Sequence, residues 1–227
     1  KPMLVRFQSA VGRDDFVEQM ILLPGKKPSV LPTTKSDSLT FVVAYNGSPS
    51  SHTALDITLL IAHQTRLATN KQVTVKIAYV IDGEANSKLK HFPNNYTISG
   101  NSWKFSTASV LKSVTTELVK PKIKALATSD RQISTKSRPV KTTCSRNSIF
   151  EKADHILWQA RYLIEEWGDA FIAHLRIGCL VEELTKVVES EATDLLFLGC
   201  QSANHPIVQK LGVNFPCPVL GIPDSIA

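Results

Sequence analysis

The sequence predicts an α/β fold in which a five-stranded parallel sheet is sandwiched by helices. Short apolar segments rich in β-branched residues alternate with segments of helical periodicity, in the order strand, helix, strand, insertion, helix, strand, helix, strand, helix, strand. Such alternation indicates parallel strands whose helical connections cover both faces of the sheet. The chain has 227 residues, of which 43% are apolar, so it can bury a core of this size with extensions to spare.

The first strand and helix are predicted around a turn signal. The segment "LTFVVAY", Leu39 to Tyr45, is a short buried strand, and "NGS" ends it. A helix follows, for which Ser50 or Ser51 is a suitable N-cap. The next apolar, β-branched segment, "QVTVKIAYVI" at residues 72–81, predicts the second strand.

Periodicity returns in the second half of the chain. Apolar residues on one face from Ile149 to Trp167 predict a long helix, with Ser148 as its N-cap. The remaining elements follow in order: strand "AFIAHLRIG", helix "CLVEELTKVVESEA", strand "DLLFLG", a short helix within "HPIVQKLG", and a last strand "CPVLGIP".

Two parts of the chain lie outside this pattern. Residues 1–38 are interpreted as an N-terminal extension and linker, in which "EQMILLPG" forms a small turn of strand or helix against the body. Residues 83–147 are polar and turn-rich, and are predicted to be a flexible insertion into an α/β domain spanning residues 39–223.

Charge and hydropathy limit the classes of partner. The formal net charge is +6, and the excess is concentrated between Lys104 and Arg146, inside the insertion. Because these charges do not form a helix face with interleaved aromatics, we interpret them as a solvated segment and expect no nucleic-acid partner. No uninterrupted apolar run of membrane-spanning length and no signal-peptide pattern is found, so we expect no membrane span and a cytoplasmic location.

The strand ends are where a ligand is expected. In open parallel sheets, ligands bind beyond the carboxyl ends of the strands at a topological switch point. Glycine at a strand-to-helix turn allows close approach to the backbone, and the N–H groups of a helix N-terminus attract phosphate. Gly199 ends one predicted strand. By spacing alone, however, a plain turn remains an alternative to a phosphate loop.

Three segments together resemble the universal stress protein family. They are "FVVAYNGSPSSHTALDIT", "VTVKIAYVID" and "ATDLLFLGCQSANHPIVQKLGVNFPCPVLGIP", and the resemblance covers roughly residues 39–82 and 148–223. It implies a five-stranded α/β fold, a role in stress response and adenine-nucleotide binding in one branch. It also implies a homodimer that pairs through the last strand, here residues 217–222.

The glycine motif of the nucleotide-binding branch keeps its spacing and changes its chemistry. Gly199 is followed by two residues and then Ser202, where the family has a second glycine. After nine intervening residues come Gly212 and Val213, and Val213 replaces a hydroxyl residue that would donate to phosphate. After the first strand, Asn46 stands where the family usually has an acid, although its amide can still bond an adenine edge.

The resemblance implies a set of binding residues for ATP or AMP, which would bind with Mg²⁺. Carried over by position, they border the base and ribose, the sugar and first phosphates, and the remaining phosphates in turn. They are Ala44, Tyr45, Asn46 and Val80; then Leu198, Gly199, Gln201 and Ser202; then Gly212, Val213, Asn214 and Phe215.

Three functions are consistent with these residues. The first is a homodimeric stress-response regulator that binds an adenine nucleotide and acts on an unknown regulatory partner. The second is an interaction module of the same fold that has lost nucleotide binding, which the changes at Asn46, Ser202 and Val213 favour. The third is a weak ATP hydrolase. No constellation of an acid, a His and a Ser and no metal-ligand spacing is visible. We therefore expect no catalytic residues, no metal site and no enzyme, with weak ATP hydrolysis as the one alternative.

Overall fold

The computed structural model describes residues 18–25, 37–82, 95–99, 142–200, 202, 204–212 and 214–223. The strands are β1 (Ile21–Leu23), β2 (Ser38–Ala44), β3 (Gln72–Asp82), β4 (Asn95–Ser99), β5 (Ile172–Gly178), β6 (Leu195–Gly199) and β7 (Val219–Ile222). The helices are α2 (Pro49–Thr69), α4 (Thr142–Glu166), α5 (Leu180–Ser190) and α6 (Pro206–Leu211). The chain comprises two compact units, Lys1–Trp103 with His155–Ala227 and Lys104–Asp154, and the sheet belongs to the first.

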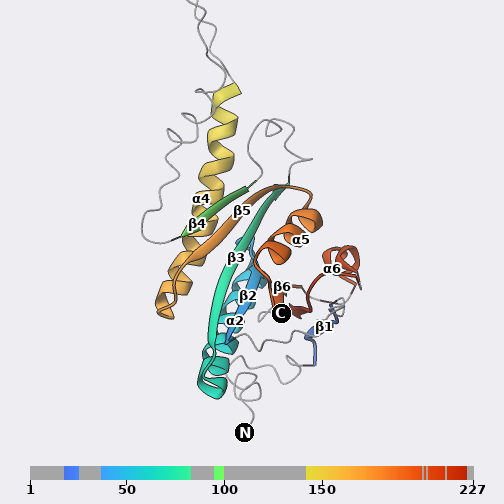
Figure 1. Ribbon diagram of the computed structural model, residues 1–227. Coiled ribbons are helices and arrows are strands. Elements are labelled where there is room, and N and C mark those ends of the chain that lie inside the picture. The colour runs from blue at the N-terminus through green and yellow to red at the C-terminus, as the bar shows by residue number, and fades with distance from the viewer. Residues whose placement is uncertain are drawn as a thin grey trace, which may run out of the picture. The chain divides into compact units, whose positions relative to one another are not determined.

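Seven strands of the described residues form one sheet in the order β1-β7-β6-β2-β3-β5-β4 (Figure 1). The five strands from β7 to β5 run parallel, as the sequence predicts. The outer strands β1 and β4 each pair antiparallel with one edge of that parallel set. The α/β class is therefore confirmed, and the sheet is wider than predicted by one antiparallel strand on each side.

The two added strands come from the segments that the pattern left outside the core. β1 belongs to the N-terminal extension and β4 to the insertion, so residues 95–99 correct the prediction that the insertion is flexible throughout. In β4, Tyr96 and Ile98 alternate with Thr97, and Ile98 is buried, which is the period of a half-buried strand. A five-residue run is too short for this period to stand out in a polar segment. The other parts of the predicted insertion and linker, except 37–38 and 142–147, lie outside the described residues.

Two helix starts differ from those predicted. The N-cap of α2 is Ser48, whose hydroxyl accepts from the Ser51 N–H at 3.3 Å, and not Ser50 or Ser51. Pro49 then occupies the first helical turn, where its missing N–H costs nothing. α4 begins at Thr142, so Ser148 lies inside the helix and does not cap it. No proline or glycine separates Thr142 from Ser148, so nothing in the backbone chemistry forces the later start.

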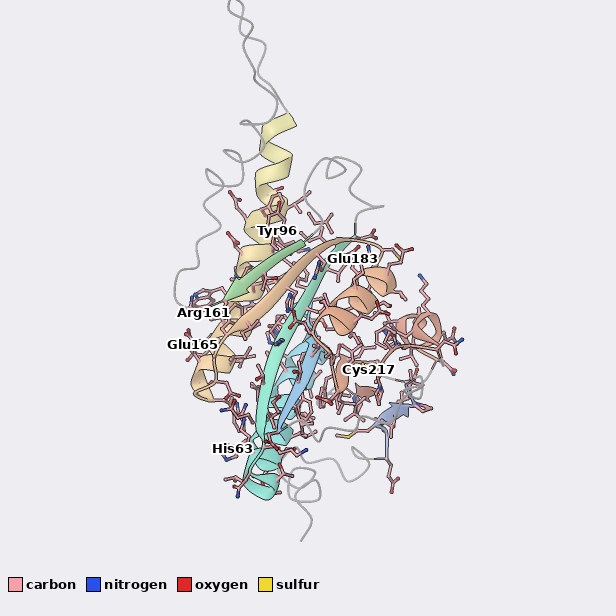
Figure 2. All side chains as sticks on the ribbon, viewed as in Figure 1. His63, Tyr96, Arg161, Glu165, Glu183 and Cys217 are labelled. Atoms are coloured by element: carbon pink, nitrogen blue, oxygen red, sulfur yellow. The ribbon has the colours of Figure 1, made fainter. Side chains whose placement is uncertain are left out.

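Helices cover both faces of the sheet (Figure 1). α2 packs on β2, β3 and β6, whereas α5 packs on β3, β5 and α6. On the α5 and α6 face, alternate strand residues such as Val42, Leu196 and Val219 form a core cluster with Leu184. Cys217, labelled in Figure 2, is buried in the same cluster. None of the helices in the described part of the chain combines the length and apolar character that a membrane span needs.

A polar cluster lies between α5 and the sheet on this face. Glu191, the C-cap residue of α5, accepts a hydrogen bond from the Lys76 ammonium of β3. Its Oε1 is also 3.3 Å from Nε2 of His174 on β5. The Nδ1 atom of His174 lies 3.3 Å from the Thr97 hydroxyl of β4. One carboxylate thus joins the end of α5 to two strands.

Candidate functional site

A cavity of about 340 Å³ opens at the carboxyl ends of β2, β3 and β6. Its volume lies within the range of about 300–1,000 Å³ that is typical of small-molecule sites. The residues that line it come from three strand ends, the start of α2, the start of α5 and the segment that leads into α6. They are Ala44, Tyr45, Asn46, Ser48, Ser50, Ser51, Ala78, Val80, Leu180, Leu198, Gly199, His205 and Ile207.

The cavity lies at the point where the strand order reverses. The chain passes from β2 to β3 on one side, whereas β6, on the other side of β2, is reached only after β5. The connections that leave β2 and β6 therefore turn away from each other above the sheet. At such a switch point two loops separate and leave a crevice in which ligands bind. Topology alone accounts for the position of this cavity.

The wall of the cavity that faces α5 and α6 is apolar. Ala44, Val80 and Leu198 project from the three strands on the face of the core cluster. Leu180 and Ile207 close the wall from α5 and α6. The two short side chains at Ala44 and Ala78 leave room beside Val80 and Leu198. A flat apolar group of the size of a nucleobase suits this wall better than a charged one.

The opposite rim is polar and is built by the turn between β2 and α2. The Asn46 side-chain oxygen accepts from the Ser48 N–H at 3.0 Å, which forms an Asx-type turn. The Ser51 hydroxyl donates to the Ser48 carbonyl at 2.8 Å, and the Ser48 and Ser50 hydroxyls lie 3.4 Å apart. The first turn of α2 carries no acidic residue. The rim therefore presents hydroxyls and the positive end of a 21-residue helix, a combination that favours an anionic group.

Tyr45 lines the cavity, but its main contacts are with other residues of the fold. The residue is only 2% exposed, and its hydroxyl lies 3.0 Å from Nδ1 of His52 on α2. Burial raises the pKa of the Tyr45 phenol, and the nearby Asp56 carboxylate raises it further, so the hydroxyl keeps its proton and shares a hydrogen bond with the His52 ring. The Tyr45 N–H also donates to the Ala78 carbonyl at 3.0 Å. Tyr45 thus fixes the wall between β2 and β3, and its hydroxyl is already engaged.

His205 is a cavity residue that the spacing argument did not select. It is the N-cap of α6, where its Nδ1 accepts from the Ile207 N–H at 3.4 Å. When Nδ1 accepts, the neutral ring carries its proton on Nε2, which can donate to a ligand oxygen. The sequence signal for this role is a histidine directly before Pro206, because proline favours the first helical position and marks the residue before it as the cap.

The structure brings together six of the twelve predicted binding residues. These six line the cavity: Ala44, Tyr45, Asn46, Val80, Leu198 and Gly199. Ser202, Gly212, Asn214 and Phe215 do not line it. Gln201 and Val213 lie outside the described residues. The residues predicted to border the base and ribose thus lie together at the cavity, whereas those predicted to surround the remaining phosphates do not.

Phe215 and Gly212 have structural roles away from the cavity. The Phe215 side chain is 3% exposed and belongs to the core cluster, which differs from its expected place beside the phosphates. An aromatic side chain of this size gains more from burial than from a polar loop. Gly212 ends α6 with φ of 61°, a left-handed value that favours glycine. Ser202 and Asn214 are exposed.

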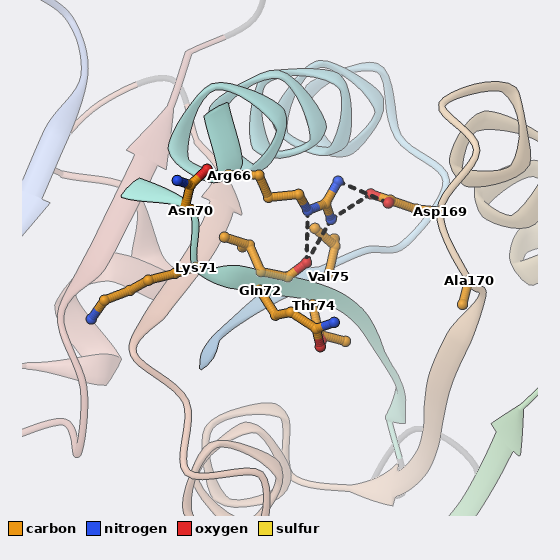
Figure 3. A pocket seen from close by; sticks show the side chains of 9 residues that line it. Arg66, Asn70, Lys71, Gln72, Thr74, Val75, Asp169 and Ala170 are labelled. Carbon is orange, nitrogen blue, oxygen red and sulfur yellow. Dashed lines mark hydrogen bonds and ion pairs between the residues drawn. The ribbon is translucent and has the colours of Figure 1, made fainter. Parts of the chain in front are cut away.

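A larger cavity, of about 500 Å³, lies at the amino end of β3 (Figure 3). Its central side chain, Arg66, donates to the Val73 carbonyl at 2.6 and 3.0 Å. Arg66 also forms a two-point ion pair with Asp169 at 2.8 and 2.9 Å. These bonds use the donors with which a guanidinium would bind a ligand, so Arg66 joins α2, β3 and the segment before β5. Despite its size, this cavity is less suited to an anionic ligand than the one at the carboxyl ends.

The fold and the cavity define a doubly wound α/β protein with a ligand-sized cavity at its topological switch point. No protein-family model and no curated protein matches the sequence. Among solved structures, the chain is similar to a universal stress protein family protein from Burkholderia pseudomallei, at 17% identity over 84% of this chain and 99% of that one, with a TM-score of 0.43.

It is also similar to a universal stress protein family protein from Arabidopsis thaliana with AMP bound, at 16% identity over 82% of this chain and 91% of that one (TM-score 0.45). A universal stress protein in complex with cAMP shares 16% identity over 78% of this chain and 84% of that one (TM-score 0.33). The chain is thus similar in fold to universal stress proteins, the family that its motifs resemble.

Proposed function

We propose that this protein binds an adenine nucleotide, ATP or AMP, in the cavity at the carboxyl ends of β2, β3 and β6, and acts as a regulator in stress response. The observation that carries the proposal is the pairing of an apolar wall with a hydroxyl-lined helix N-terminus across one cavity of about 340 Å³. The base packs on Val80 and Leu198, and the phosphates face Ser48, Ser50 and His205. The cytoplasmic location stays a prediction, and so does the homodimer through residues 217–222, although β1 covers the free edge of that strand in this chain.

Asn46 is the residue that reads the base in this proposal. Its side-chain oxygen already accepts from the Ser48 N–H, which fixes the orientation of the amide. The amide nitrogen then donates to a ring nitrogen of adenine, which is an acceptor. A carboxylate at this position could only accept. The change from the acid of the family to Asn46 therefore keeps a base contact and reverses its direction.

Thermal unfolding with and without ligand tests this proposal. At a ligand concentration about 100 times the dissociation constant, binding stabilises the folded state by about 2.7 kcal/mol, which raises the Tm of a chain of this size by roughly 5–10 °C. ATP, AMP, adenosine and tripolyphosphate are compared. We expect ATP or AMP to protect the chain more than either adenosine or tripolyphosphate, because only the nucleotide engages both sides of the cavity.

Two matched alanine-to-leucine variants test whether the increase in Tm comes from ligand bound in this cavity. Ala44→Leu fills the space beside Val80 and is expected to abolish the protection by nucleotide. Ala170→Leu makes the same change at the amino-end cavity and is expected to leave the protection intact. Absence of any shift with ATP and AMP at millimolar concentration, or an equal loss in both variants, would contradict the proposal.

A second function is an interaction module of the same fold that does not bind nucleotide. The positions of the residues predicted to contact phosphate favour it. Phe215 is in the core, and Ser202 is exposed outside the cavity. If this function is correct, the unmodified chain shows no protection by ATP, and the double variant Ser202→Gly with Val213→Ser gains it by restoring the residues of the nucleotide-binding branch. Protection of the unmodified chain by ATP would exclude this second function.

A further inference from the structure

β7 is one edge strand of the parallel set and pairs with β6, whose carboxyl end borders the carboxyl-end cavity. β7 pairs with β6 on one side, in the register Leu196 to Val219 through Gly199 to Ile222. Its sequence, "VLGI", contains no charge and no proline. Sheet edges that lack these features present unpaired N–H and C=O groups to which an extended segment of another chain can add. Without a cover, β7 would be such an edge.

The chain itself provides a cover for this edge. β1 pairs antiparallel with β7, so that Ile21 lies opposite Gly221, Leu22 opposite Leu220 and Leu23 opposite Val219. Ile21 and Leu23 pack against the core cluster, whereas the Leu22 side chain is 66% exposed. The alternation is that of a strand with one buried face.

Gly25 holds the segment after β1 close to the turn before β7. A Cβ atom at Gly25 would lie 2.3 Å from the carbonyl carbon of Cys217 and 2.5 Å from the nitrogen of Pro218. The two backbones therefore touch, and only glycine allows this approach. The cover is thus held by backbone pairing, by two half-buried side chains and by one backbone contact.

We propose that Ile21–Leu23 is an exchangeable intramolecular cap on β7, which occupies the place that β7 of a second copy would take. Antiparallel pairing of a strand with its own copy is two-fold symmetric, which is the symmetry of most dimers. In the pairing centred on Leu220, Val219 of the second copy lies opposite Gly221, where Ile21 lies now. A β-branched side chain fills the space beside Gly221 in both arrangements. The chain therefore pairs through β7 only when β1 has left it.

The mass of the protein in solution tests the cap, and the result does not depend on nucleotide binding. Because β1 covers the edge through which the family resemblance predicts a homodimer, the full chain of 25.0 kDa is expected to be monomeric across the micromolar range by light scattering and sedimentation, and to dimerise only when β1 is released. The variant Ile21→Asp with Leu23→Asp places two charges against the core cluster, so β1 is released and the mass is expected to double. The control Leu22→Asp adds the same charge to the exposed side of β1 and is expected to stay monomeric.

A second variant releases β1 without burying charge. Gly25→Val places a side chain where the Cys217 and Pro218 backbone lies, and it is expected to give the same dimer. A full chain that is already dimeric, or a folded, monomeric form of both release variants, would overturn the proposal. Unfolding of both release variants would overturn it as well, because a strand that cannot leave a folded chain is not exchangeable.

A designed disulfide distinguishes a cap within one chain from strand exchange between two. Leu22 and Leu220 are directly opposite each other in an antiparallel pair, where the Cα atoms are close enough for a disulfide. In a background with Cys144→Ser and Cys179→Ser, the oxidised Leu22→Cys, Leu220→Cys chain is expected to migrate as a monomer on a non-reducing gel. A covalent dimer would show that β1 pairs with a second copy and would overturn the intramolecular cap.

Discussion

Gly199→Ala is expected to destabilise the protein by about 3 kcal/mol, because overpacking against fixed backbone is at the upper end of the costs of such changes. A Cβ atom at Gly199 would lie 2.4 Å from both the carbonyl carbon and the oxygen of Ser50, and 2.8 Å from the Ser51 nitrogen. These are backbone atoms in the first turn of α2, which cannot rotate away. The helix start would have to move off the end of β6.

Thermal unfolding and urea titration measure this effect. For a chain of this size, a loss of about 3 kcal/mol lowers the Tm by roughly 6–12 °C. Gly221→Ala on the adjacent strand is the matched control, because its Cβ would meet the Cys200 sulfur at 2.4 Å, a side-chain atom that can change rotamer. We expect Gly221→Ala to cost about 1 kcal/mol, at the lower end of the same range. Equal costs for the two variants would contradict the explanation.

A substitution at Gly199 does not test ligand contact alone, because it also disturbs the start of α2. The glycine spacing assigned Gly199 to a phosphate loop, where a side chain would obstruct the ligand. In the structure, the atoms nearest to the missing side chain belong to α2. Loss of nucleotide binding in a Gly199 variant would therefore follow from a displaced helix N-terminus. Ala44→Leu, which changes the cavity wall and not the contact between α2 and β6, is the better probe.

The order of the core elements was predictable because each carries its own periodicity. The alternating apolar segments of β2, β3 and β5 and the helical stripe of α4 were visible in the sequence, and their alternation determined the parallel sheet. β4 was not predicted because its five residues alternate within a polar, turn-rich segment. β1 was predicted only as a small turn of strand or helix against the body, because three apolar residues do not distinguish the two periods. Both strands exist through pairing with β7 and β5, which is tertiary information.

The candidate site was predictable to the extent that it follows from strand ends. Ala44, Val80 and Leu198, which the family resemblance implied, are the last inward-facing residues of their strands, and this position is what brings them to the cavity. His205 was not among the predicted binding residues, because a histidine that opens a short helix is more often a cap than a ligand contact; in the structure it both caps α6 and lines the cavity. Gly199 does line the cavity, but a sequence does not show that its backbone also lies against the first turn of α2.

Glu191→Gln is the second change for which we expect a large effect, a loss of about 2 kcal/mol, below the 3–5 kcal/mol of fully buried pairs. The Lys76 and Glu191 side chains are 17% and 22% exposed, and His174 is 2% exposed. Removing the negative charge leaves the Lys76 ammonium partly buried without its partner. Glu189→Gln, at an exposed position of α5, is the matched control and is expected to change stability by less than about 0.5 kcal/mol.

A double-mutant cycle separates the ion pair from simple loss of packing. Lys76→Met keeps the aliphatic part of the side chain and removes the charge. If the pair carries the effect, the two single losses exceed the double loss by about 1–2 kcal/mol in urea titrations, which is the usual coupling of interacting charges. Additive losses would show that the Glu191 carboxylate acts independently of Lys76.

The pH dependence of stability provides a readout that packing alone does not change. Burial lowers the pKa of His174, and the charges of Arg176 and Lys76 lower it further, against the opposing charge of Glu191. The unfolded chain therefore binds this proton first as the pH decreases below about 6.5, so the free energy of unfolding decreases from that pH toward the folded pKa. Burial alone would raise the pKa of Glu191, but the hydrogen bond from Lys76 and the charge of His174 lower it.

The contribution of Glu191 is consequently complete above its unfolded pKa of about 4.3 and is lost only below it, so of these two groups only His174 changes the stability between pH 7 and pH 5. Removing Glu191 removes the one interaction that opposes the decrease in the His174 pKa. We therefore expect a steeper loss of stability over this interval in Glu191→Gln than in the unmodified chain, and a shallower one in His174→Gln. Parallel profiles for all three proteins would show that His174 does not titrate against this carboxylate.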